Sequence, residues 1–202
     1  MNMTHFIWMT LPPGDVSGRG EHISRVAAKH GLEVESVVAL RVDGAGYVEP
    51  TQTSATLADA LASLDEGVGG GDVGWRASAG EASVVIGPVT VGDRRGLVLR
   101  FTQKDFYELD GALKGGGLLE LIAGLHETCG AREVMWARNV SAARIVEILD
   151  GDPADLHPST LDSVAALAEV KEDLFESMKI YGDVTWSGNL RFVAQGWARP
   201  NA

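Results

Sequence analysis

A glycine-rich loop with two nearby basic residues is the first place where residue types and spacing could do chemistry. Segment 13–20 reads Pro-Gly-Asp-Val-Ser-Gly-Arg-Gly and lies between an expected strand and an expected helix. The backbone N–H groups of such a loop can bind an anion, and Arg19 and His22 would add positive charge. The loop lacks the Gly-Lys-Ser/Thr ending of a P-loop and the glycine spacing of a dinucleotide site. A weak anion site and an ordinary surface loop are both open interpretations, and the second is favoured.

His126 and Cys129 lie three residues apart near the end of an expected helix, so they share one helix face. A zinc site would need two more ligands, and the chain has no second cysteine and no paired histidines. The same two residues could serve as base and nucleophile, although such pairs usually come from distant segments. A buried cysteine beside a histidine that stabilises the helix end is favoured. No metal site and no cofactor are predicted.

Acidic residues are abundant, and two or three of them in one cleft would support acid–base chemistry or a hard metal ion. Segment 150–155, Asp-Gly-Asp-Pro-Ala-Asp, has some aspartates of a calcium loop but lacks its glycine and its terminal glutamate. The sequence shows that carboxylates are numerous, not that they converge. A solvated turn is the expectation for this segment.

Two of the five tryptophans, Trp75 and Trp186, open expected hairpins, and each follows a Gly-Asp-Val-x segment. Packing in the core is favoured for all five, because large aromatic side chains dominate protein cores. Alternatively, Trp75 and Trp186 line a pocket or contact a partner. The candidate residues for binding a ligand or a partner are Trp75, Trp186, Asp72, Asp183, Arg19 and His22.

The sequence contains no Gly-x-Ser-x-Gly, His-Glu-x-x-His or Cys-x-x-Cys motif. Enzyme classes that carry these signatures are therefore disfavoured. No catalytic residue is assigned, and a binding protein is favoured over an enzyme.

The hydrophobic pattern predicts alternating strands and helices along the whole chain. Strands are expected at 5–11 (a buried one), 34–42, 75–79, 83–91, 96–103, 132–140, 183–186 and 190–195. Helices are expected at 21–30, from a cap at Ser54 or Thr56 to Leu64, at 105–113, 118–127 and 141–149 with Ser141 as cap, and at 160–180. The last of these is the longest, since apolar residues recur at helical spacing from Leu161 to Met178.

This pattern predicts an α+β fold in which helices pack on one or two mixed or antiparallel sheets. Residues 71–75 (Gly-Asp-Val-Gly-Trp) resemble residues 182–186 (Gly-Asp-Val-Thr-Trp), and the order of elements is similar in the two halves. One interpretation is therefore two tandem β-α-β-α-β-β units, at 1–93 and 94–202, with the long helix added to the second. The other is one compact domain overall.

Composition narrows the classes of function. The formal net charge of −11 argues against a nucleic-acid binder, which needs a basic face. A single cysteine cannot form an internal disulfide. We find no basic start before an apolar segment and no run of about 20 apolar residues, so neither a signal peptide nor a membrane span is expected. A cytoplasmic protein is the simplest expectation.

Two hypotheses of different class follow. The first is an acidic docking protein, of the immunity or antitoxin type or a regulatory adaptor, that binds a partner protein of basic charge. The second is a small-molecule-binding protein or an enzyme without a recognisable signature, with its site in a groove between the two halves. A structural subunit of a larger assembly is a third class. The oligomeric state is not predicted.

Overall fold

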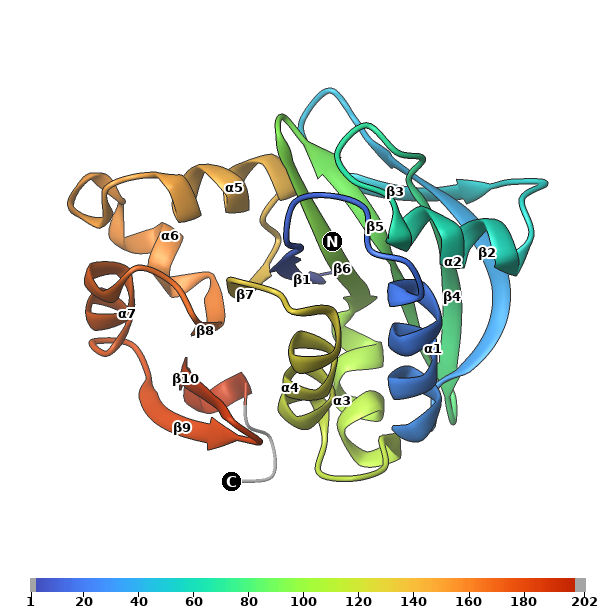
Figure 1. Cartoon of the computed structure of the whole chain (residues 1–202). Coiled ribbons are helices and arrows are strands. Elements are labelled where there is room, and N and C mark those ends of the chain that lie inside the picture. The colour runs from blue at the N-terminus through green and yellow to red at the C-terminus, as the bar shows by residue number, and fades with distance from the viewer. Residues whose placement is uncertain (1–2, 199–202) are drawn as a thin grey trace.

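The computed structural model describes residues 3–198, which build one ten-stranded sheet flanked by helices (Figure 1). The strands follow the order β3-β2-β4-β5-β6-β1-β7-β8-β10-β9, and neighbouring strands are antiparallel. The strands are β1 (Thr4–Thr10), β2 (Glu33–Val42), β3 (Val48–Gln52), β4 (Val73–Ala79), β5 (Ala82–Val91), β6 (Arg94–Thr102), β7 (Val134–Arg138), β8 (Val164–Ala168), β9 (Asp183–Ser187) and β10 (Leu190–Ala194).

Seven α-helices within residues 3–198 cover the two faces of the sheet. Buried side chains of the first four helices pack in one core cluster, and those of the last three pack in a second cluster on the opposite face. Helices beside an antiparallel sheet confirm the predicted α+β class. The helices are α1 (Arg19–Lys29), α2 (Leu57–Asp65), α3 (Gln103–Ala112), α4 (Leu118–Cys129), α5 (Ala142–Asp150), α6 (Pro158–Asp162) and α7 (Glu172–Met178).

The central strand β1 shows why this chain forms a sheet covered on both faces. Ile7 and Met9 lie in the cluster with α1–α4, whereas Phe6 and Trp8 lie in the cluster with α5–α7. Successive side chains of a strand point to opposite faces, so a strand covered on both sides is apolar throughout. The apolar run expected to form a buried strand is therefore the buried strand β1.

The chain builds the two ends of the sheet in opposite order. In the first half, the outer hairpin β2–β3 precedes the inner strands β4 and β5; in the second half, β7 and β8 precede the outer hairpin β9–β10. β2 thus lies next to an edge, whereas β7, its counterpart in the proposed repeat, pairs with β1. The boundary between 93 and 94 falls in the turn between β5 and β6, inside the continuous sheet. The division into 1–93 and 94–202 stays a prediction. Strands that correspond in the two proposed units occupy different positions in the sheet.

The prediction of one long helix at 160–180 is wrong. This segment contains α6, then β8, then α7. All five residues of β8, Val-Ala-Ala-Leu-Ala, are buried, and the strand lies between β7 and β10. The larger apolar residues have helical spacing, but the alanines between them are buried as well. Periodicity alone cannot assign such a short apolar run.

Strand β3 has no counterpart among the expected strands. Its sequence is Val-Glu-Pro-Thr-Gln, and proline weakens a strand signal because it has no N–H group to donate. Pro50 is accommodated because β3 is an edge strand, hydrogen-bonded to β2. The expected helix caps are confirmed: Thr56, rather than Ser54, accepts from the first turn of α2, and Ser141 does so for α5.

Candidate functional site

The glycine-rich loop before α1 is closed by a carboxylate of the protein itself. The N–H groups of Gly18 and Gly20 donate to the two oxygens of Asp65 at 2.9 and 2.8 Å. Arg19 is buried, and its Nη1 lies 3.4 Å from a carbonyl oxygen near the end of α2. The anion that such a loop favours is therefore internal, and these hydrogen bonds hold the start of α1 against the end of α2. His22 lies exposed on α1.

The two tryptophans of the proposed repeat have opposite surroundings. Trp75 in β4 is fully buried, whereas Trp186 in β9 is 66% exposed. Core packing, the favoured prediction, is therefore correct for Trp75 and wrong for Trp186. β4 and β9 lie on opposite sides of the central strands, so the two side chains do not line one common groove, which was the alternative. Asp72 accepts a hydrogen bond from the buried Arg95 at 2.8 Å, which makes it part of a structural ion pair. Of the six predicted residues, Asp183 and Trp186 are the pair that β9 brings together.

Strand β9 has two backbone units that point away from the sheet. Gln195, the residue after β10, donates its N–H to the carbonyl oxygen of Ala165 in β8. This N–H therefore points toward β8. Because N–H direction alternates along a strand, residues 190, 192 and 194 direct their backbone groups toward β9. Their register partners there are 187, 185 and 183. Val184 and Trp186 therefore direct their N–H and C=O groups outward, at an edge to which no strand of the described chain is added.

The side chains of Val184 and Trp186 lie on one face of β9. Val184 is opposite Val193, which packs in the core cluster of α7, so both side chains lie on the α7 face. Val184 is 44% exposed, and Ile180, three residues before β9, is 82% exposed. Trp186 is the most exposed tryptophan of the described chain. The open edge of β9 thus combines free backbone groups with apolar side chains.

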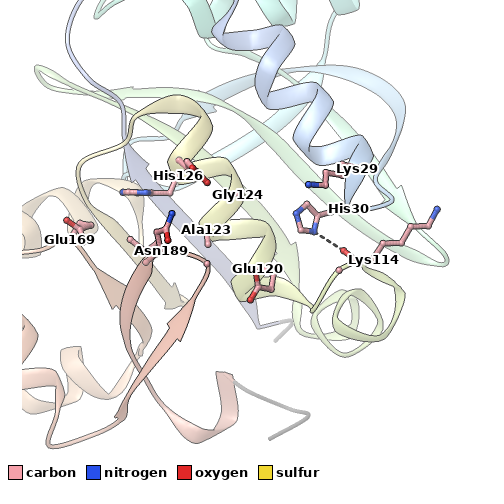
Figure 2. A pocket seen from close by; sticks show the side chains of 13 residues that line it. Lys29, His30, Lys114, Glu120, Ala123, Gly124, His126, Glu169 and Asn189 are labelled. Atoms are coloured by element: carbon pink, nitrogen blue, oxygen red, sulfur yellow. Dashed lines mark hydrogen bonds between the residues drawn. The ribbon is translucent and has the colours of Figure 1, made fainter.

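A pocket of about 620 Å³ lies across α4, and we call it the α4 pocket (Figure 2). One wall comes from the end of α1 and the α3–α4 loop; the other comes from Glu169 and the β9–β10 turn. The turn approaches α4 closely, since a Cβ added at Gly188 would lie 3.6 Å from Ala123. The α4 pocket therefore has residues of both predicted halves in its walls.

His30 is held at one end of the α4 pocket in a defined tautomer. Its Nδ1 lies 2.8 Å from the carbonyl oxygen of Lys114, and the N–H of Lys114 donates to the carbonyl oxygen of His30. A carbonyl oxygen only accepts, so Nδ1 carries the proton. Nε2 faces Gly124, where an added Cβ would be 3.5 Å away. In the neutral imidazole this Nε2 is a hydrogen-bond acceptor.

His126 lies at the opposite end from His30, on the side of Glu169 (Figure 2). Glu127, the next residue of α4, also lines the pocket. Burial lowers the pKa of His126, and the charges of Glu169 and Glu127 act in the opposite direction. Nε2 of His126 is buried and has no hydrogen-bond partner in the described structure. Glu169 has φ 54°, a conformation that residues other than glycine rarely adopt. Such backbone strain gathers at functional sites.

Cys129 is not a reactive partner of His126. Its Sγ lies 3.8 Å from the backbone carbonyl oxygen of His126, and burial raises the pKa of the thiol to about 11. A thiol that stays protonated is a poor nucleophile and a poor metal ligand. Among the residues that the structure describes, no group of three or more His, Cys, Asp or Glu side chains could hold a metal ion.

No protein-family model, curated protein or solved structure matches this chain. Within residues 3–198 no helix is both long and apolar enough to cross a lipid bilayer. The open edge of β9 and the α4 pocket are therefore the features from which a function is inferred.

The α4 pocket is not evident from sequence, because His30, Glu169 and Asn189 belong to three distant segments. None of them stands in a recognisable motif. For β9 a signal is present: a strand with valine and tryptophan at alternate positions, no proline and a single charge. Its place at an edge depends on the sheet order, which sequence pattern does not show.

Proposed function

We propose that this protein is a docking protein that binds an extended segment of a partner protein as an additional strand along β9. The observation that carries the proposal is the outward direction of the backbone groups of Val184 and Trp186. Strand addition takes its affinity from main-chain hydrogen bonds and its specificity from alternate side chains. Trp186 would supply the main specific contact, because exposed tryptophans are typical of binding hot spots.

The partner is expected to have a segment that is apolar at alternate positions and to be basic overall. Apolar side chains opposite Val184 and Trp186 would form the aromatic and β-branched pairs that stabilise sheets. The net charge of −11 attracts a basic partner and repels a second copy of this chain. At the strand itself the acidic residue is Asp183, which begins β9. The carboxylate of Glu172 already forms a salt bridge at 3.5 Å with Arg191, the register partner of Trp186.

Two biological roles fit this proposal: neutralisation of another protein, as immunity and antitoxin proteins do, and regulation by an adaptor. In both roles the protein acts by covering part of the partner's surface, which needs no catalytic group. A cytoplasmic location goes with them, since the single cysteine, Cys129, is a free thiol, as is usual in a reducing compartment.

The test is capture of partners from an extract of the protein's own cells, with variants compared side by side. Val184→Pro removes an outward N–H group, and Trp186→Ser removes the exposed ring. Tyr107→Ser is the matched control, because Tyr107 is also 66% exposed but lies on α3. Circular dichroism verifies that each variant is folded.

A partner that binds the wild type and Tyr107→Ser, but neither β9 variant, supports the proposal. Its retention is expected to fall as salt rises, because the attraction is partly electrostatic. A partner retained by both β9 variants contradicts strand addition. Self-association in sedimentation experiments that both β9 variants abolish would replace the foreign partner with a second copy.

A further inference from the structure

One end of the α4 pocket has a net positive charge. Lys29 and His30 at the end of α1 line it together with Lys114 of the α3–α4 loop. Of the carboxylates that line the pocket, the one beside this loop is that of Glu120, whose Cγ would lie 2.6 Å from a Cβ added at Gly116 (Figure 2). The two hydrogen bonds between His30 and Lys114 fix this end. Within the described residues, neither lysine ammonium group forms a salt bridge. The next residue, Gly115 (φ 87°), also lines the pocket, and as a glycine it leaves the rim without a side chain at this point.

The other end is anionic. Glu169, which follows β8, lies on the His126 side of the pocket (Figure 2). Glu127 of α4 lines the pocket beside His126 and acts on its pKa together with Glu169. Neither carboxylate forms a salt bridge within the part of the chain that the structure describes. The unpartnered Nε2 of His126 adds an unsatisfied polar atom at this end, and such atoms usually have a partner in a native structure.

Uncharged polar groups of the α4 pocket suit a peptide main chain. Nε2 of His30 is an acceptor above Gly124, and Asn189 brings both a donor and an acceptor from the β9–β10 turn. The pocket crosses α4, and a helix is about 10 Å wide with its side chains. An extended chain rises about 3.3 Å per residue, so about three residues span this width.

We propose that the α4 pocket binds a short zwitterionic peptide, with its carboxylate beside Lys29 and Lys114 and its ammonium group beside Glu127 and Glu169. A ligand with one kind of charge would meet like charge at one end of the pocket, whereas a dipolar ligand is attracted at both. The volume of about 620 Å³ is typical of ligand sites. This site is independent of strand addition at β9, because Val184 and Trp186 lie on the other face.

Trialanine is the probe, and binding is followed by NMR through the imidazole signals of His30 and His126 in the intact chain. N-acetyl-trialanine amide, which lacks both charges, is the matched ligand control. Glu169→Gln and Lys114→Gln each remove one charged contact and are expected to raise the Kd about tenfold. Lys104→Gln is the protein control, since Lys104 is exposed on α3 outside the pocket.

Shifts of both histidine signals with trialanine, absent with the capped peptide and weakened by the two pocket variants, support the proposal. Equal binding of the capped peptide, or unchanged binding to Glu169→Gln and Lys114→Gln, overturns it. Trialanine that leaves both histidine signals unmoved at millimolar concentration overturns it as well. Trp186→Ser is expected to bind trialanine normally, so failure of this proposal and failure of docking at β9 are distinguishable.

Discussion

The two edges of the sheet are built differently. β3 has Pro50 at its centre with Glu49 beside it, whereas β9 has Val184 and Trp186 and no proline. Proline and charged side chains are common means by which proteins keep edge strands from pairing with other chains. β3 uses both means, and β9 has one acidic residue at its start. Figure 1 shows the two edges at opposite ends of the molecule.

This difference indicates that the exposure of β9 is not a general consequence of the sheet architecture. The same chain closes one edge and leaves the other open, with a large aromatic side chain on it. An open apolar edge carries a risk of aggregation, so its retention beside a closed edge favours a binding role.

The largest effect is expected from Trp75, the buried counterpart of Trp186. Trp75→Ala is predicted to lower the free energy of unfolding by about 3–5 kcal/mol, because it leaves a cavity in the core. Trp186→Ala is predicted to change it by less than about 0.5 kcal/mol, because the ring is exposed. Urea denaturation of both variants measures the difference. A large loss for Trp186→Ala would show that β9 needs this ring for folding rather than for binding.

Val184→Pro places a proline in β9, as Pro50 does in β3. It is predicted to weaken partner binding about a hundredfold, because it removes the outward N–H donor of residue 184 and blocks the approach of a strand. The free energy of unfolding is expected to fall by less than about 1 kcal/mol, because the outward N–H makes no ladder hydrogen bond. Titration calorimetry with the captured partner measures the first effect, and urea denaturation the second. Binding that survives this substitution would place the partner elsewhere.

The same comparison shows how much of the fold sequence alone predicts. Buried strands such as β1 and capped helices such as α5 are predicted well, because their signals are local. β3 is missed because Pro50 removes the strand signal, and β8 is mistaken for a helix because every residue in it is buried. Both errors come from tertiary context, which decides whether a strand lies at an edge or in the centre.

The candidate site is predicted less well, for a related reason. Trp75 and Trp186 follow nearly identical segments, yet one is buried and the other exposed. The loop around Gly18 binds a carboxylate, which was the less favoured of the two interpretations, and that carboxylate belongs to Asp65, 45 residues beyond Gly20. Local sequence identifies the chemical preference of each group in these cases, while its partner depends on the fold.

Lowering the pH is predicted to destabilise the protein through the centre of the sheet rather than through its edges. His5 in β1 is fully buried, accepts from Trp136 at Nδ1 and lies 2.9 Å from Gln103 at Nε2. Burial lowers its pKa from 6.5, while the hydrogen bond with Gln103 acts in the opposite direction. Above about pH 6.5 both states are neutral; below it the unfolded state takes up a proton that the folded state resists. The free energy of unfolding therefore falls as the pH drops.

One proton contributes at most about 1.4 kcal/mol per pH unit to this slope. Urea denaturation at pH 7.5 and 5.5 measures it. His5→Phe is expected to start less stable, because it leaves Trp136 without its acceptor, but to show a shallower slope. His126, whose pKa burial also lowers, accounts for part of the remaining slope. His22→Gln is the control, since His22 is exposed; an unchanged slope in His5→Phe would contradict the assignment.

A small effect on stability is expected where the closed edge is opened. Pro50→Val restores an N–H group and β propensity to β3 and is predicted to change the free energy of unfolding by about 0.5 kcal/mol. Self-association is predicted to increase in sedimentation experiments at high protein concentration, because a second unblocked edge is then present. Glu49 still repels a second copy, so Pro50→Val combined with Glu49→Thr should associate more strongly. If both variants stay as monomeric as the wild type, Pro50 and Glu49 do not close this edge, and the contrast with β9 loses its meaning for function.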